Sequence, residues 1–177
     1  SSMETYVFLM VSLLLFWSLL PQGAPSTYRP KQGLQISDTD VQHFQNDWIL
    51  SRLSQHMVAT TGKSLQETYA PKSICFGCGP SNDSGLRIRS YRDGEELLMS
   101  FRPSIEHQAF PGIINGGIIG TLMDCHGNWT AAIALMDRDS LPEPPCTVTA
   151  SYNVRLLRPT PYGKEITIRA LSLIHIW

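Results

Sequence analysis

The sequence predicts a single α+β domain, in which an antiparallel sheet wraps around one long helix. Two stretches whose apolar residues alternate with polar ones flank a central apolar run that has helical spacing. The resulting order is strand, strand, long helix, strand, strand. With 177 residues and a hydrophobic share of 42 %, the chain can bury a proper core. The net charge of −1 and the scattered Lys and Arg residues argue against nucleic-acid binding.

Residues 1–24 are predicted to be a hydrophobic targeting or anchor segment. Tyr6 to Leu20 form an apolar run broken only by serines, and no Lys or Arg occurs before Arg29. This length suits the h-region of a signal peptide better than a membrane span. We therefore expect secretory or organelle targeting, or a membrane anchor, with membrane contact only through residues 6–20.

Residues 25–74 are predicted to be a linker followed by an accessory helix. Pro25 to Gly33 are rich in Pro, Ser and Gly, as linkers are. Asp40 to Met57 then repeat apolar residues near the helical period, and Asp38 or Thr39 is available as the cap. We expect this helix to pack on the main domain, which covers residues 75–177.

The main domain is predicted to begin with a turn region and a hairpin. After Cys75 to Gly85, the segments Leu86–Arg89 and Leu97–Phe101 have strand patterns, and Asp93-Gly94 between them is typical of a hairpin turn. After a loop, Gly116 to about Met136 is apolar nearly all round, which predicts a helix that is buried on most sides.

Two further strands are expected after this helix. The Pro-rich loop Leu141–Pro145 ends the helix, and Cys146–Leu157 alternates again. A turn then leads to a strand from Lys164 to about Ala170. Because the last apolar residues would form an exposed edge, we expect one or two C-terminal strands to be missing from this sequence.

The start of the central helix has the equipment for acyl chemistry. The pair Gly116-Gly117 precedes Asp124 by about two helical turns, so backbone N–H groups and a carboxylate lie on nearly the same face. Free N–H groups at a helix start can polarise a carbonyl. Cys125 and His126 follow Asp124 directly, but consecutive helical residues point about 100° apart and cannot form a nucleophilic pair.

The cysteines allow a zinc or redox site without favouring one. Cys75-Phe76-Gly77-Cys78 could be half of such a site, but only His107 and Cys146 offer distant completions. A tight turn with two partly buried thiols is the simpler interpretation. We therefore predict no metal site and no cofactor.

Three separated motifs resemble the hotdog-fold acyl-CoA thioesterases, of the phenylacetate-pathway or thioesterase-superfamily-member type. They are His107–Gly112, then Asn115–Gly117 followed by Asp124, and finally Tyr152–Pro159. The resemblance covers about residues 75–170. It implies a homodimer or homotetramer with active sites at the subunit interface, acting on an acyl-CoA substrate that is hydrolysed to a free acid and coenzyme A.

The resemblance also implies the roles of individual residues. The Gly117 N–H would polarise the thioester carbonyl, and Asp124 from the helix of the partner subunit would act as general base or nucleophile. Asn115 stands where many members have His; its amide can orient a water or hold a carbonyl, but it cannot shuttle a proton. Further substrate-binding candidates are His107, Gln108, Gly116, Asn128, Arg155 and Arg158.

The Asn in place of His leaves a second function open. The chain would then be a non-catalytic module that binds acyl-CoA or an acyl carrier. A hydratase of the same fold is a weaker alternative, since no Asp/His hydratase pair is present in the loop and helix. The sequence does not determine the length of the acyl chain.

Overall fold

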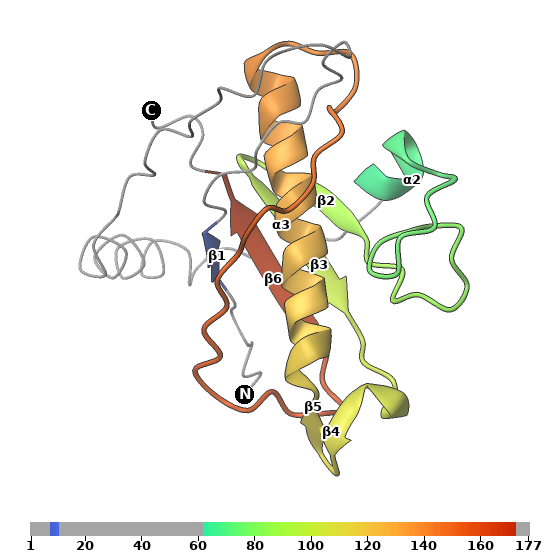
Figure 1. Ribbon diagram of the computed structural model, residues 1–177, viewed down its shortest axis with the longest axis vertical. Helices are drawn as coiled ribbons and strands as arrows, with labels where there is room; N and C mark the ends of the chain where they lie inside the picture. Colours follow the sequence, from blue (N-terminus) through green and yellow to red (C-terminus); the bar gives the residue numbers. More distant parts are fainter. Residues whose placement is uncertain (1–7, 11–61, 173–177) are drawn as a thin grey trace, which may run out of the picture. The chain divides into compact units, whose positions relative to one another are not determined.

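The computed structural model describes residues 8–10 and 62–172, and all of them belong to one compact unit. The accessory helix predicted over 40–57 and most of the predicted targeting segment lie outside the described residues. None of the helices in the described part is long and apolar enough to span a membrane. This unit shows the predicted α+β class, with one long helix packed on a mainly antiparallel sheet (Figure 1).

The sheet has four strands in the order β1-β6-β3-β2. The neighbouring pairs β2–β3 and β3–β6 are antiparallel, whereas β1 pairs with β6 in parallel, which the sequence did not predict. Strand β6 confirms the strand predicted from residue 164 to about 170. The strands are β1 (Phe8–Met10), β2 (Ser90–Asp93), β3 (Glu96–Phe101) and β6 (Ile166–Leu171).

The β2–β3 hairpin turns where the sequence indicated. Asp93 pairs with Glu96, and Gly94 takes a φ of 63° at the first loop position, a conformation that favours glycine. The first strand, however, was predicted over 86–89 and actually begins at Ser90. Arg87 has a φ of 51°, so the backbone breaks the extended conformation just before the ladder starts.

Helix α3 (Gly116–Arg138) confirms the predicted central helix and lies across the sheet, in contact with β3 and β6 (Figure 1). It ends where Ser140 adopts a left-handed φ of 50° and the Leu141 N–H donates to the Met136 carbonyl at 2.9 Å. The buried residues that form the core between this helix and the sheet include Ile88, Met99, Phe101, Ile114, Ile119, Leu122, Met123, Ile166 and Ile168.

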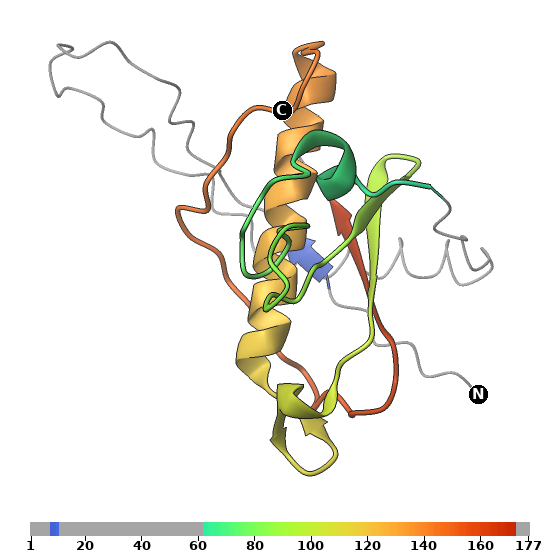
Figure 2. The same cartoon turned by 90° about the vertical axis from the view of Figure 1, so that its right-hand side faces the viewer.

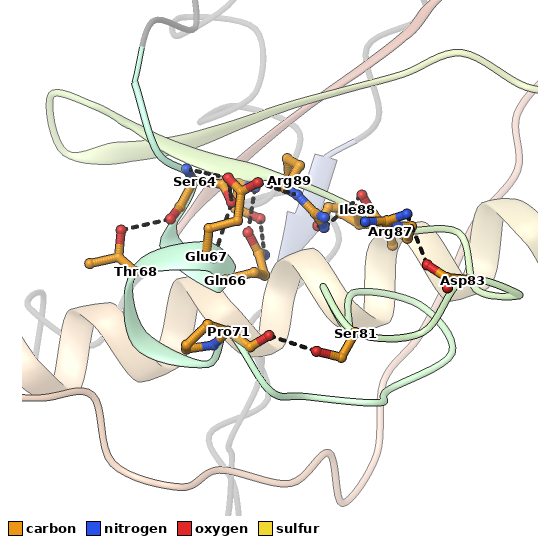
Figure 3. A network of polar contacts seen from close by, with 11 residues as sticks. Ser64, Gln66, Glu67, Thr68, Pro71, Ser81, Asp83, Arg87, Ile88 and Arg89 are labelled. Atoms are coloured by element: carbon orange, nitrogen blue, oxygen red, sulfur yellow. Dashed lines mark hydrogen bonds and ion pairs between the residues drawn. The ribbon is translucent and has the colours of Figure 1, made fainter.

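The short helix α2 (Leu65–Tyr69) joins the edge of the domain through polar contacts (Figure 3). Ser64 and Glu67 form a capping box, in which each side chain accepts from the other's backbone N–H. The Glu67 carboxylate is also 3.4 Å from the Arg89 guanidinium. Buried Gln66 donates to the Ser90 hydroxyl at 2.9 Å and accepts from the Ser90 N–H at 2.8 Å. These bonds fix α2 against the start of β2.

A compact loop leads from β3 into α3. It consists of a 3₁₀ turn, η1 (Ile105–His107), and a small hairpin of β4 (Gln108–Phe110) and β5 (Ile113–Ile114). The hairpin lies at the N-terminal end of α3 (Figure 1). It therefore sets the position of the residues that start the helix.

The prediction of a strand over residues 146–157 is wrong, because this segment forms no strand in the described part of the chain. Instead, residues 141–160 run back alongside α3 from its C-terminal to its N-terminal end (Figures 1 and 2). A strand needs a neighbour for its backbone hydrogen bonds. Both edges of β6 are occupied, one by β3 and the other by β1, so the alternating segment finds no place beside it.

Candidate active site

The N-terminus of α3 is capped by the residue that precedes the glycine pair. Asn115 has an extended backbone, with φ −64° and ψ 132°, and its Oδ1 accepts the Gly117 N–H at 2.7 Å. Asn115, Gly116 and Gly117 are all exposed. The structure thus brings two predicted site residues together, and the N–H expected to bind a carbonyl already has an acceptor in the side chain of Asn115.

The glycines of this turn allow close approach of other groups. A Cβ on Gly116 would lie 3.2 Å from Cδ1 of Leu156, and one on Gly117 would lie 2.9 Å from the capping Oδ1 of Asn115. One helical turn later, a Cβ on Gly120 would lie 3.5 Å from the Tyr152 hydroxyl. Residues 152–156 therefore pass directly over the first turns of α3.

Asp124 is half-buried, and its Oδ1 is buried without a hydrogen-bond partner among the described residues. Gly120 and Asn128, one turn before and after it on the same helix face, both contact residues 147–152. Asp124 therefore faces this segment as well. A buried polar oxygen that lacks a partner costs about 1–3 kcal/mol and calls for an explanation.

Asn128 holds the returning segment against the helix. Its Oδ1 accepts from the Thr147 hydroxyl at 2.8 Å, and its Nδ2 lies 3.4 Å from the Thr149 hydroxyl. The sequence predicted Asn128 as a substrate-binding residue, and in the structure its amide bonds to Thr147 and Thr149 of this segment. Arg155 and Arg158 lie further along the same segment, and both are exposed.

His107 and Gln108 brace the loop that precedes α3. The backbone oxygen of His107 accepts the Asn115 N–H at 2.9 Å, and its ring Nδ1 accepts the Ser104 N–H at 3.1 Å. The Gln108 side chain accepts the Gly112 N–H at 2.7 Å and so closes the β4–β5 hairpin. These contacts fix the point where the capping Asn115 leaves the loop.

His126 is a buried structural residue that the sequence did not reveal. Its Nε2 lies 3.1 Å from the Leu97 carbonyl, which can only accept, so Nε2 carries the proton and Nδ1 accepts from the Ser90 hydroxyl at 2.9 Å. Burial lowers the pKa of His126 to about 4, opposed by the bond to Leu97. The neutral ring links α3 to both β2 and β3.

Three of the four cysteines meet at one place beside α3. The Sγ atoms of Cys75, Cys78 and Cys125 all lie within 4.8 Å of one another. From the sequence, only His107 and Cys146 were considered as further ligands for a site at Cys75 and Cys78. This was wrong, because neither residue belongs to the group. The hydrogen bond from Cys125, aided by one from the Trp129 indole and opposed by burial, lowers the pKa of Cys78 to about 6.

The cysteine cluster could not be predicted from the spacing of its residues in the sequence. Cys125 is far from the Cys75–Cys78 turn in the sequence, so only the packing of the turn on α3 brings it close. No local pattern could have identified it as a partner.

Known proteins were compared with this chain by family, by sequence and by structure. No protein-family model matches the chain, and no curated protein matches it either. Among solved structures, the chain is similar to a thioesterase superfamily protein from Shewanella loihica PV-4, with 39 % sequence identity and a TM-score of 0.40. The match covers 46 % of this chain, which spans 65 % of the length of that protein.

Proposed function

We propose that this chain hydrolyses acyl-CoA thioesters, as a member of the phenylacetate-pathway or thioesterase-superfamily-member type, and acts as a homodimer or homotetramer. The observation that carries the proposal is the unpaired, buried oxygen of Asp124, two turns after a glycine pair at a helix start. The similarity to a thioesterase superfamily protein supports a thioester hydrolase function.

In the proposed reaction, the start of α3 serves as the oxyanion hole. The thioester carbonyl binds at the Gly117 N–H, where the positive end of the helix dipole stabilises the oxyanion that develops. Asp124, contributed by the helix of the partner subunit, takes a proton from a water molecule as that water attacks the carbonyl carbon. The C–S bond then breaks, the proton passes to the sulfur, and the free acid and coenzyme A leave.

The residues around the start of α3 would bind the substrate. The loop that carries His107 and Gln108 would form one wall of the binding site, and Gly116, which has no side chain, would let the substrate approach the helix backbone closely. Arg155 and Arg158 are exposed guanidinium groups on the segment that passes over this site. We assign them to the phosphates of coenzyme A, which guanidinium groups bind in a bidentate manner.

Hydrolysis is tested with a panel of acyl-CoA esters that spans short, long and aromatic acyl groups. Free coenzyme A is measured by chromatography, because thiol reagents would also react with the protein's four cysteines. We expect saturable release from at least one ester. Tight binding of the esters without release at any acyl length would contradict hydrolysis and favour the alternative of an acyl-CoA or acyl-carrier binding module.

The capping bond of Asn115 makes a prediction about Gly117. The carbonyl must replace the Asn115 Oδ1 at the Gly117 N–H, since the two acceptors compete for one donor. Asn115→Gly removes the competitor, and Asn115→Asp places a negative charge next to the oxyanion. Both residues are good N-caps, so stability changes little. We expect kcat/KM of the Asp variant to be at least about tenfold below that of the Gly variant.

The matched pair separates two roles of Asn115. If both variants lose activity equally, Asn115 itself holds the substrate or the water. If both retain wild-type kcat/KM, the Gly117 N–H does not bind the carbonyl. Thermal unfolding of each variant shows whether the helix start is still capped.

A further inference from the structure

Cys75, Cys78 and Cys125 lie on two segments that pack side by side. The first two are on the turn region between α2 and β2, which passes over α3 (Figure 2). Cys125 is on α3 itself. Cys78 is buried, Cys125 is half-buried, and Cys75 is exposed, so the group reaches from the core to the surface.

The distances suit a tetrahedral thiolate site. The Sγ atoms of Cys75 and Cys125 are 3.8 Å apart, and all three sulfurs lie within 4.8 Å of one another. A Zn–S bond is about 2.3 Å long, so two sulfurs of a tetrahedral zinc site are about 3.8 Å apart. The thiols need to move little to take three corners of such a tetrahedron.

The backbone of the turn is built to hold the sulfurs in place. A Cβ on Gly77 would lie 2.3 Å from the Cys125 Sγ, and one on Gly79 would lie 2.5 Å from the Cys75 backbone nitrogen. Only glycine allows the turn to approach α3 so closely. The Gly79 N–H donates to the Cys75 carbonyl at 2.8 Å, which tightens the loop between the two cysteines.

A hydrogen-bond donor outside the group supports one of the sulfurs. The indole Nε1 of Trp129 lies 3.4 Å from the Cys78 Sγ and can only donate. Donors of this kind orient and stabilise thiolate ligands. Together with the three sulfurs, this makes a formed site rather than a chance approach of side chains.

We propose that Cys75, Cys78 and Cys125 bind one thiophilic metal ion, Zn²⁺ being the ion that best fits the spacing, with the fourth position open to solvent beside exposed Cys75. The ion fastens the turn around residues 75–79 to α3. A helix rotation of about 100° separates Cys125 from Asp124, so the site is distinct from the catalytic one. The proposal therefore does not depend on thioesterase activity.

The site is tested on the reduced full-length chain. The protein is incubated with Zn²⁺, desalted and analysed for bound metal, and Co²⁺ is used in parallel because thiolate ligation gives it a charge-transfer absorption. We expect one ion per chain, and a higher unfolding temperature with Zn²⁺ than with a chelator. Cys75→Ser should weaken binding by at least about 100-fold.

Cys146→Ser is the matched control, because Cys146 is also exposed but lies outside the group. It should bind the ion as the wild type does. Exposed Cys75 contributes little to the core, so Cys75→Ser should fold normally in the presence of chelator. Equal metal binding by the two variants, or substoichiometric metal in the wild type, would overturn the proposal. So would a disulfide between two of the three thiols in protein isolated without oxygen.

Discussion

Replacing Asp124 with Asn is expected to reduce kcat for acyl-CoA hydrolysis by about 10²–10⁴-fold, the usual contribution of a positioned general base. Asn has nearly the same shape as Asp but cannot take a proton from water. Binding of a non-hydrolysable acyl-CoA analogue should change less than severalfold, and the oligomeric state should stay the same. The two effects are measured by steady-state kinetics and by calorimetry.

The same variant should not lose stability. The Oδ1 of Asp124 is buried and has no partner among the described residues, so the native state gains little from the charged carboxylate. We expect the melting temperature of Asp124→Asn to equal or exceed that of the wild type. A structural carboxylate would give the opposite result, because its loss would break contacts that hold the fold.

A second carboxylate on the same helix provides the control. Asp137 lies near the end of α3, where it pairs with Arg92 at 2.7 Å on the surface. Asp137→Asn should leave hydrolysis unchanged. Full turnover in Asp124→Asn, or an equal loss in both variants, would remove Asp124 from the mechanism.

The elements that could be predicted are those whose conformation is determined by residues close together in the sequence. Gly94 permits the turn of the β2–β3 hairpin, and Asn115 caps a long apolar run, so both the hairpin and α3 follow from neighbouring residues. The alternation over 146–157 failed because strand formation depends on a partner edge. In the structure β1 occupies that edge of β6.

In the candidate site, too, features set by local spacing could be predicted, whereas contacts made by distant segments could not. The glycine pair and Asp124 share one helix, so their common face could be read from a spacing of two turns. The cap formed by Asn115 on Gly117 was not anticipated, although it uses the same amide that suggested a catalytic role. Cys125 and His126 gain their contacts only from distant segments, and a sequence contains no local trace of such packing.

His126 should make the folded domain sensitive to mild acid. The pKa of His126 is about 4 in the folded chain, whereas an unperturbed histidine, as in the unfolded chain, has a pKa of 6.5. As the pH falls, the unfolded chain therefore binds the extra proton first. The contribution of His126 to stability is therefore complete above pH 6.5 and is lost as the pH falls toward 4. The difference corresponds to about 3 kcal/mol in the free energy of unfolding.

The comparison with His126→Gln isolates this contribution. Glutamine cannot titrate, and its amide can still donate to the Leu97 carbonyl and accept from Ser90. The variant starts less stable, because a ring that fills a buried site is lost. Between pH 6.5 and 4.5, however, its free energy of unfolding should fall much less than that of the wild type. Denaturant titrations across this range measure both slopes, and parallel slopes would show that His126 does not set the acid sensitivity.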